Sequence, residues 1–281
     1  MKIFKKNRVE ATNIEDKAAF TFNLFISSFS GVATTYVIQD IHLGKIFHLL
    51  YCNSGLHVSK EIESIAMHGD RKFIQNIRRD YLKDGLLEEN IDSDPVLQFS
   101  KWFSHAIDEN LVDGNAMTLA TSAGGRPNAR VVLLKSFDQE GFTFYTNYGS
   151  KKSLELEEND QATLLFYWAE FERQVKICGT VKKTSREESE EYFHSRPRES
   201  QIGAMASRQS ETLQSRNHLE EVYKKLNKDY EGKDVPLPSF WGGFTLKPDY
   251  FEFWQGRPNR LHDRIIYDLL NGSWQTKRLY P

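Results

Sequence analysis

A succession of short runs rich in Val, Leu, Phe and Tyr, separated by brief turns, most constrains the fold of this chain. The turns include Gly124-Gly125 and Asp138–Gly141. Most of these connections are too short for the crossover helices that parallel strands need. We therefore predict a mainly β (α+β) fold with an antiparallel sheet, as in a barrel or a sandwich. The runs are Ala116–Thr121, Ala129–Phe137, Phe142–Thr146, Ala162–Trp168 and Gln174–Val181.

Helix-capping signals interrupt the strands. Asp94 followed by Pro95 predicts the start of a helix, and Ser185 with Glu188 forms a capping box that opens another. Residues 150–158 and 215–230 are two further predicted helices, each with a serine at its N-terminus. The chain returns to strands after Trp241, where Asn271-Gly272 is a hairpin signal.

The composition excludes several classes of protein. The formal net charge is −2 in 281 residues, so the chain carries no general attraction for nucleic acid or for an acidic membrane. Two cysteines cannot form a disulfide framework, and they favour a reducing, cytoplasmic location. The eight histidines show no metal-ligand spacing with Cys or Glu, so we predict no metal site. There is also no Walker loop, no dinucleotide glycine fingerprint and no nucleophile elbow.

Residues 1–70 differ in character from the rest. They are apolar and rich in Ser and Thr from Ala18 to Val58, without a clear period. Glu10, Glu15 and Asp16 stand where a secretory signal or a transit peptide carries positive charge. We therefore predict a disordered or loosely attached extension over residues 1–70, followed by one domain over residues 71–281.

One candidate anion site is the strand from Arg130 to Lys135, which carries a cation at each end. Strict alternation places these two side chains on opposite faces, so a shared ligand needs a bulge, and otherwise there are two ligands. An ordinary core strand whose ends reach solvent is the alternative interpretation.

A second candidate runs from Tyr145 through Thr146 and Ser150 to Lys151 and Lys152. It joins a strand end to a helix start, where free backbone N–H groups and the helix dipole favour phosphate. The alternative is a capped helix with solvated lysines.

Tyr192, Arg196 and Ser200 form a third candidate, because a spacing of four would place them on one helix face. Pro197 predicts instead that one helix ends near Arg196 and that another begins with Pro197 in its first turn. A charged surface turn is the alternative interpretation.

The fourth candidate is Arg260, His262 and Arg264, which we expect on one face of a strand. Three potential cations on one face repel each other, so the arrangement favours an anionic ligand. Trp254, a few residues before them, could stack on a planar ring or lie in the core.

Taken as a set, these motifs resemble one family, the pyridoxine/pyridoxamine 5′-phosphate oxidases. The resemblance covers roughly residues 74 to 281, in order and almost without gaps. The matching stretches are Arg130–Lys135, Phe144–Asn147, Glu172–Val175, Tyr192–Arg198, Ser200–Ala204, Arg208–Ser210, Val235–Gly243, Glu252–Gly256 and Arg260–Arg264.

This resemblance implies an FMN-binding split β-barrel, built as an antiparallel Greek key with flanking helices. It also implies a homodimer with one flavin in each of two clefts between the subunits. The substrate phosphate is then expected at Lys135, Tyr192, Arg196 and Ser200, and the pyridine ring under Arg260 and His262, with Leu261 between them. Arg78, Arg79 and Tyr81 match a segment that in relatives closes over the substrate. The residues expected to hold FMN are Arg130, Val131, Val132, Leu133, Leu134, Lys135, Tyr145, Thr146, Ser150, Lys151, Lys152, Gln174, Gln209, Ser210, Trp254 and Arg264.

The reaction implied by the resemblance is oxidation of pyridoxamine 5′-phosphate or pyridoxine 5′-phosphate to pyridoxal 5′-phosphate, with dioxygen reduced to hydrogen peroxide. Hydride passes from substrate C4′ to flavin N5, and Arg260 and His262 act as catalytic residues that position the substrate. Lys151 departs from the family, where many relatives have Arg, and loses bidentate geometry. Two alternatives remain. One is a non-catalytic protein that binds flavin or pyridoxal phosphate. The other is a different split-barrel flavoprotein, which would lack Tyr192, Arg196, Ser200, Arg260 and His262.

Overall fold

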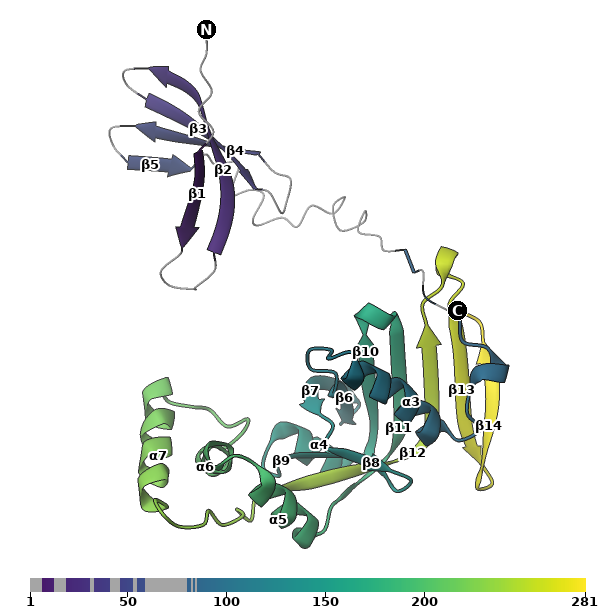
Figure 1. Ribbon diagram of the computed structural model, residues 1–281. Coiled ribbons are helices and arrows are strands. Elements are labelled where there is room, and N and C mark those ends of the chain that lie inside the picture. Colours follow the sequence, from purple (N-terminus) through teal and green to yellow (C-terminus); the bar gives the residue numbers. More distant parts are fainter. Residues whose placement is uncertain are drawn as a thin grey trace. The chain divides into compact units, whose positions relative to one another are not determined.

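The structure is a computed structural model in two compact units, residues 1–79 and residues 80–281 (Figure 1). It describes residues 80, 81, 83 and 85–281 in full and residues 7–12, 19–30, 33–40, 46–52 and 55–58 as backbone. Arg78 and Arg79, two predicted substrate residues, lie outside the described residues.

The first unit contains an antiparallel sheet whose five strands follow each other in chain order. The sequence shows no clear strand period in this region, so the five strands were not predicted. One reason lies in the pairing of the second and third strands, where a bulge between Ile26 and Ser28 shifts the alternation. How loosely this unit is attached stays a prediction. Its strands are β1 (Asn7–Thr12), β2 (Ala19–Ser30), β3 (Ala33–Asp40), β4 (Ile46–Cys52) and β5 (Gly55–Val58).

The second unit is built on a nine-stranded sheet in which every pairing is antiparallel, as the short connections predict. Seven strands follow the order β14-β13-β12-β11-β10-β6-β7, and β8 pairs with β9. The strands are β6 (Ala116–Ala123), β7 (Arg126–Leu133), β8 (Ser136–Asp138), β9 (Gly141–Asn147), β10 (Gln161–Trp168), β11 (Arg173–Lys183), β12 (Trp241–Gln255), β13 (Asp263–Leu270) and β14 (Ser273–Leu279).

The longest of these strands, β12, divides the sheet. Its first six residues pair with β9, and its residues from Tyr250 to Gln255 pair with β13, while β11 lies along its other side. The sheet is therefore split between two directions rather than closed. Figure 1 shows α5, α6 and α7 at one end of this unit, with β13 and β14 at the other.

The helices begin where the capping signals predict. Asp94 Oδ1 accepts a hydrogen bond from Val96 N at 2.8 Å, and Ser185 and Glu188 form the predicted capping box. Pro197 differs slightly from the prediction, because it precedes the helix as its cap residue. The helices are α3 (Pro95–Asp108), α4 (Lys151–Glu158), α5 (Arg186–Ser195), α6 (Arg198–Ala206) and α7 (Arg216–Asp229), with short 3-10 turns η1 (Glu88–Asn90), η2 (Ala169–Phe171) and η3 (Pro258–Arg260).

The main core lies between α3 and the sheet. Phe99 of α3 is fully buried, and its ring lies 5.0 Å from those of Phe142 and Phe166. A smaller apolar group joins α5 and α6 to the start of β12 through Phe193, Ile202 and Trp241. These apolar contacts hold the two helices against the end of the sheet where most of the predicted site residues lie.

Candidate functional site

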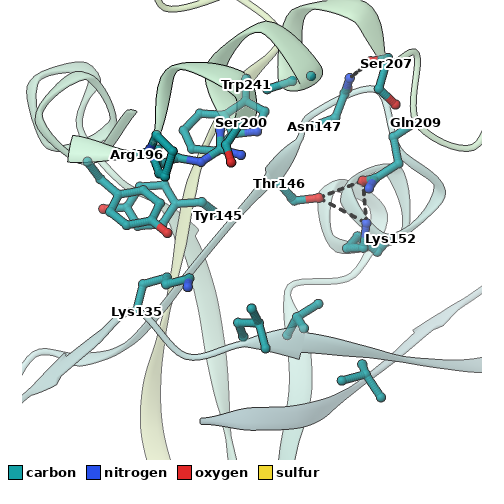
Figure 2. A pocket seen from close by; sticks show the side chains of 17 residues that line it. Lys135, Tyr145, Thr146, Asn147, Lys152, Arg196, Ser200, Ser207, Gln209 and Trp241 are labelled. Carbon is teal, nitrogen blue, oxygen red and sulfur yellow. Dashed lines mark hydrogen bonds between the residues drawn. The ribbon is translucent and has the colours of Figure 1, made fainter. Parts of the chain in front are cut away.

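A cavity of about 670 Å³ opens between the edge strand β7, the end of β9, the start of β12 and the helices α5 and α6. Figure 2 shows its lining side chains converging from these elements. Of the predicted site residues, eleven line it: Val131, Val132, Leu133, Lys135, Tyr145, Thr146, Lys152, Tyr192, Arg196, Ser200 and Gln209. Residues from the first, second and third candidate anion sites thus meet at one cavity.

One end of this cavity is built around Arg196. Its Nη1 atom is buried and has no hydrogen-bond partner among the described residues. Burial lowers the pKa of Arg196. A guanidinium group is a strong donor that costs free energy when it is buried without an acceptor. Arg196 is therefore suited to an anion that enters the cavity.

Two further cavity residues add polar groups at this end. Ser200 follows Arg196 across the break at Pro197, and Lys135 Nζ lies 6.0 Å from the centre of the Tyr192 ring. Arg196 itself takes extended backbone angles before the proline, as expected for that position. The break between α5 and α6 thus brings Arg196 and Ser200 to the same cavity without a continuous helix.

The other end is a network around Lys152. Lys152 Nζ donates to Gln209 Oε1 at 2.7 Å, to Thr146 Oγ1 at 3.0 Å and to Ser150 Oγ at 3.2 Å. Burial and the nearby charge of Arg130 lower the pKa of Lys152 to about 8. The three residues that accept hydrogen bonds from Lys152 are all neutral. They do not neutralise its ammonium group, which can therefore pair with a bound anion.

The start of α4 extends this polar end. Lys151 N donates to Ser210 Oγ at 3.1 Å, and Ser210 has a left-handed φ of 75°. The Lys151 side chain is exposed. Ser150 does not cap α4 with its side chain; its hydroxyl lies 3.0 Å from that of Ser153 instead. The backbone N–H groups at this helix start therefore have few side-chain acceptors.

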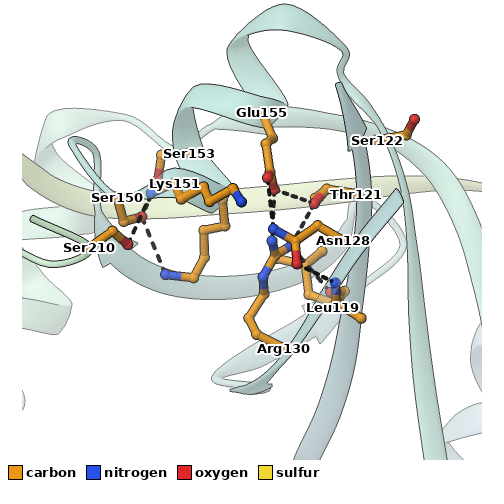
Figure 3. A network of polar contacts seen from close by, with 12 residues as sticks. Leu119, Thr121, Ser122, Asn128, Arg130, Ser150, Lys151, Ser153, Glu155 and Ser210 are labelled. Atoms are coloured by element: carbon orange, nitrogen blue, oxygen red, sulfur yellow. Dashed lines mark hydrogen bonds and ion pairs between the residues drawn. The ribbon is translucent and has the colours of Figure 1, made fainter. Parts of the chain in front are cut away.

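Arg130 and Leu134 do not line the cavity, although their neighbours do. Arg130 Nη2 lies 2.7 Å from Glu155 Oε2, and its Nη1 donates to Thr121 Oγ1 at 2.6 Å (Figure 3). Leu134 is buried in the main core. Arg130 and Lys135 are thus separated, but not by alternation along one strand, because β7 ends at Leu133 and Lys135 lies between β7 and β8.

The remaining predicted residues that the structure describes lie in or beside a second cluster near the far end of β12. Tyr81, Trp254 and His262 contact one another, with ring centres 5.7, 5.2 and 4.7 Å apart. Tyr81 lies close against the backbone at Gly256, where a Cβ atom would come within 2.4 Å of its ring. A larger residue at 256 would therefore displace Tyr81.

His262 has a defined hydrogen-bonding state in this cluster. Arg257 N donates to His262 Nδ1 at 3.0 Å, which requires that Nδ1 be unprotonated and leaves Nε2 as the donor of the neutral ring. Burial, and then the charge of Arg260, lower the pKa of His262. A neutral imidazole at neutral pH follows from both observations.

Arg264 and Gln174 flank Trp254 on the neighbouring strands, according to the pairing register. Arg264 Nε donates to Glu252 Oε1 at 2.8 Å, and Lys176 Nζ lies 2.7 Å from Glu252 Oε2. Glu252 is buried, and a buried carboxylate needs such cationic partners. Its ion pair with Arg264 in turn holds the Arg264 side chain in position.

The prediction that Arg260, His262 and Arg264 alternate on one strand is wrong. Residues 258–260 form the turn η3, and β13 begins only at Asp263. Asn259 and Arg260 both have left-handed backbone angles, with φ of 57° and 62°, which no strand accommodates. Arg260 and Leu261 are exposed at the rim of this cluster.

The cavity and the second cluster lie at opposite ends of β12. Trp241, the first residue of the strand, lines the cavity, and Trp254, near its end, belongs to the cluster. At roughly 3.3 Å per residue, the two tryptophans are about 40 Å apart along the strand. A single subunit therefore does not bring all the predicted residues together.

Sequence reasoning missed six lining residues: Asn147, Pro197, Gly203, Ala204, Ser207 and Trp241. The Tyr145 ring stacks on that of Tyr192 at 4.0 Å and lies 5.5 Å from that of Trp241. Trp241 stands inside a quoted family motif, but no local pattern distinguishes a cavity tryptophan from a core one.

No described helix is long and apolar enough to cross a membrane. No group of three or more His, Cys, Asp or Glu side chains among the same residues is arranged to hold a metal ion.

Comparison with known proteins assigns the fold and the family. The family model for pyridoxamine 5′-phosphate oxidase matches residues 103–226, and that for the pyridoxine 5′-phosphate oxidase C-terminal dimerisation region matches residues 241–281. Among solved structures, PhzG from Burkholderia lata 383, in complex with tetrahydrophenazine-1-carboxylic acid, is 30% identical with a TM-score of 0.67, covering 71% of this chain and 99% of that one. A pyridoxamine 5′-phosphate oxidase-related, FMN binding protein from Nostoc punctiforme PCC 73102 shares the fold at 14% identity and a TM-score of 0.53, covering 65% of this chain and 97% of that one.

Curated sequences are closer. The pyridoxine/pyridoxamine 5′-phosphate oxidase of Rubrobacter xylanophilus is 52% identical over 214 residues, which are 76% of this chain and 99% of the relative. The enzyme of the same name from Nostoc sp. is 51% identical over 210 residues, 74% of this chain and 98% of the relative. With an FMN-binding split-barrel fold and this identity over nearly the whole length of its relatives, the chain belongs to the pyridoxine/pyridoxamine 5′-phosphate oxidase family.

Proposed function

We propose that this chain is an FMN-dependent oxidase that converts pyridoxamine 5′-phosphate and pyridoxine 5′-phosphate to pyridoxal 5′-phosphate and reduces dioxygen to hydrogen peroxide. The family assignment supports the reaction. The observation in this structure that carries it is the buried, unpartnered Nη1 of Arg196 at a cavity that also contains Lys135 and Ser200. These groups match a phosphate monoester.

At the substrate end, each side chain has its own part in the proposal. Arg196 contributes charged donors with fixed geometry, and Lys135 adds a second positive charge. Ser200 and Tyr192 contribute hydroxyl groups that can donate to phosphate oxygens. A phosphorylated substrate would thus be anchored by its phosphate, which leaves its ring to be oriented by other residues.

The polar end of the cavity fits the phosphate of FMN. Lys152, Thr146, Gln209 and Ser210 would hold it, with Lys151 N–H at the start of α4. The residues Val131, Val132 and Leu133 belong to β7, which lies at the edge of the sheet. An edge strand presents backbone donors and acceptors, and the imide edge of a flavin ring offers the complementary pattern. FMN, when bound, supplies the two-electron oxidation and the reaction with dioxygen.

Two subunits are needed to complete each site. The span of β12 separates the cavity from Trp254, His262 and Arg264 by more than the length of FMN. A two-fold homodimer can place this second cluster of one subunit over the cavity of the other. The matching C-terminal dimerisation region, which spans β12 to β14, supports this arrangement.

Arg260 and His262 are proposed as the catalytic residues. The exposed guanidinium of Arg260 would orient the substrate ring, and the neutral His262 would donate from Nε2 to its polar substituents. Tyr81 closes over the same cluster, with Arg78, Arg79 and Leu261 proposed as further substrate contacts. Two cysteines in the chain support the remaining part of the proposal, a cytoplasmic location.

One assay tests the proposal. The FMN-loaded protein is incubated in air with pyridoxamine 5′-phosphate, and peroxide and pyridoxal 5′-phosphate are measured together. We expect equal amounts of both products and less product from unphosphorylated pyridoxamine. Tetrahydrophenazine-1-carboxylic acid, the molecule in complex with PhzG, is tested in the same assay as a compound without phosphate. Tight binding of flavin and pyridoxal phosphate without turnover would instead identify a non-catalytic binding protein.

A further inference from the structure

The Arg196 guanidinium has an aromatic neighbour that none of the predicted roles includes. Its Cζ atom lies 4.8 Å from the centre of the Trp241 ring, against 5.9 Å for the Phe193 ring. Figure 2 shows Arg196 and Trp241 next to Ser200 in the cavity. Trp241 is 6% exposed, so the contact is shielded from water. A shielded cation–π contact with tryptophan is the strongest of its kind.

The Trp241 ring is held in place by the backbone that leads up to it. Arg186 donates to the carbonyl oxygens of Leu237 at 2.6 Å, Pro238 at 3.0 Å and Trp241 at 3.4 Å. Trp241 N donates to Pro238 O at 3.2 Å. One arginine therefore fixes the loop that leads into β12, and with it the position of the tryptophan.

The aromatic neighbours of Trp241 fix the orientation of its ring. Tyr145 and Tyr192 lie nearly parallel to it, at interplanar angles of 13° and 9°, and Phe193 packs at 66°. Rings packed on several sides have few alternative rotamers. The surface that Trp241 presents to Arg196 is therefore rigid.

Among the described residues, Arg196 has no ion-pair partner that could hold its guanidinium group in position. Its backbone is anchored, because Gln201 Nε2 donates to Arg196 O at 2.9 Å. An aromatic ring stabilises a guanidinium group without offering it an oxygen acceptor. The N–H groups of Arg196 thus stay available for an anion. A carboxylate partner would instead compete with the anion for these N–H groups.

We propose that Trp241 is a positioning residue for phosphate recognition, which holds the Arg196 guanidinium by a cation–π contact in the orientation that binds the substrate phosphate. This inference rests on the proposed function of the cavity. Trp241 acts through Arg196, so its effect depends on Arg196 and on the phosphate of the ligand.

The first measurement is the split between KM and kcat. We expect Trp241→Leu to raise the KM for pyridoxine 5′-phosphate by about 3- to 30-fold, the range of shielded cation–π contacts, with kcat nearly unchanged. Trp241→Phe keeps a ring with a weaker π face, so its KM should lie between those of the wild type and Trp241→Leu.

A matched control separates positioning from general destabilisation. Phe244 is another buried aromatic residue on β12, and its ring packs against Phe144 and Tyr148 rather than Arg196. Phe244→Leu should lower the melting temperature as Trp241→Leu does, with the KM unchanged.

A double-variant cycle tests whether Trp241 acts through Arg196. In the Arg196→Ala background, Trp241→Leu should cause no further increase in KM, because the group that it positions is absent. Equilibrium binding of pyridoxal 5′-phosphate and of pyridoxal gives a readout independent of turnover. Only binding of the phosphorylated compound should weaken in Trp241→Leu and Trp241→Phe.

Three results would overturn the inference: an equal rise in KM for Phe244→Leu, an additive effect in the Arg196→Ala background, or equal weakening of pyridoxal and pyridoxal 5′-phosphate. If Trp241→Leu does not fold, Trp241→Phe decides, and unchanged phosphate-dependent binding in that variant overturns the inference too. Failure of the proposed function looks different, because wild-type protein would then neither oxidise nor preferentially bind the phosphorylated compounds.

Discussion

Arg130 and Glu155 form an ion pair beside the cavity, with Arg130 Nη2 2.7 Å from Glu155 Oε2. Asn128 Nδ2 and Thr121 Oγ1 donate to the same carboxylate at 2.8 and 2.7 Å. Figure 3 shows these donors converging on Glu155 from two strands. This pair ties α4, which carries Lys151 and Lys152, to the strands β6 and β7.

The Glu155 network predicts a loss of stability in acid. Burial raises the pKa of Glu155, but the hydrogen bonds from Asn128, Thr121 and Arg130 outweigh it and lower the pKa from 4.5 to about 2. Because the folded state has the lower pKa, this stabilisation is fully present above pH 4.5 and is lost as the pH falls toward 2. Urea unfolding across this range should show a shallower pH dependence for Glu155→Gln than for the wild type.

Glu157→Gln is the control on the same helix. Glu157 pairs with Lys183, and both side chains are nearly half exposed, so its removal should change stability little. Equal pH dependence in the wild type and Glu155→Gln would show that other groups cause the acid loss.

Mixed dimers test whether two subunits build each site. Arg196→Ala damages the cavity, and Arg260→Ala damages the second cluster at the far end of β12. If each site takes one part from each subunit, a hybrid of the two variants contains one intact site, so random mixing should restore about a quarter of wild-type activity. The measurement is the rate after subunit exchange of equal amounts, with each variant exchanged against itself as the control. No recovery despite verified hybrids would mean that both parts act within one subunit.

Arg260→Ala should impair substrate oxidation without removing the flavin. Arg260 is exposed and sits at the rim, so the variant should stay yellow, dimeric and as thermally stable as the wild type. Flavin reduction by pyridoxine 5′-phosphate should slow by at least ~10-fold, because misplacing C4′ loses proximity. Stopped-flow measurement of both half-reactions checks this, and reoxidation by dioxygen should be unchanged. A slowed reoxidation with normal reduction would place Arg260 on the oxygen side.

The same variant should raise the pKa of His262. Burial lowers this pKa first, and the positive charge of Arg260 lowers it further, so removing the charge reverses part of the shift. Titration of the His262 ring signals by NMR in both proteins measures the difference. A lowered or unchanged pKa would mean that the charge of Arg260 does not reach the imidazole.

A chain that begins at Met67 should fold, form dimers and keep full activity. The family models match only residues 103–226 and 241–281, and the first compact unit ends at Arg79. Because strands β1 to β5 pair only among themselves in the described residues, their removal breaks no ladder of the nine-stranded sheet. Flavin content, sedimentation and activity of both chain lengths provide the test. Aggregation or flavin loss in the shorter chain alone would give the first unit a structural role.

Local signals predicted the local structure well. Asp94 before Pro95, the Ser185–Glu188 capping box and the Asn271-Gly272 hairpin each depend on residues within one turn, and each is confirmed. Short connections likewise predicted antiparallel strands. These features need no knowledge of the rest of the chain.

Contacts between distant residues could not be predicted in the same way. Glu155 accepts a hydrogen bond from Arg130, which is 25 positions away in the sequence. No periodicity in the sequence predicts that pair. Alternation failed at Arg260 because left-handed angles at Asn259 and Arg260 interrupt the strand. The strands before residue 59 escaped detection although apolar residues alternate at 20, 22, 24 and 26, since Phe25 and the bulge after Ile26 break the pattern. The roles assigned by family resemblance stay predictions.

The length of β12 has an evolutionary consequence. Covalent geometry, rather than side-chain packing, sets the distance from Trp241 to Trp254, because each residue of an extended chain adds a fixed rise. Substitutions along the strand leave that distance intact, whereas deleting one residue shortens it and turns every later side chain to the opposite face. We therefore expect this stretch to tolerate changes of residue type far better than insertions or deletions, so that its number of residues is inherited more strictly than its composition.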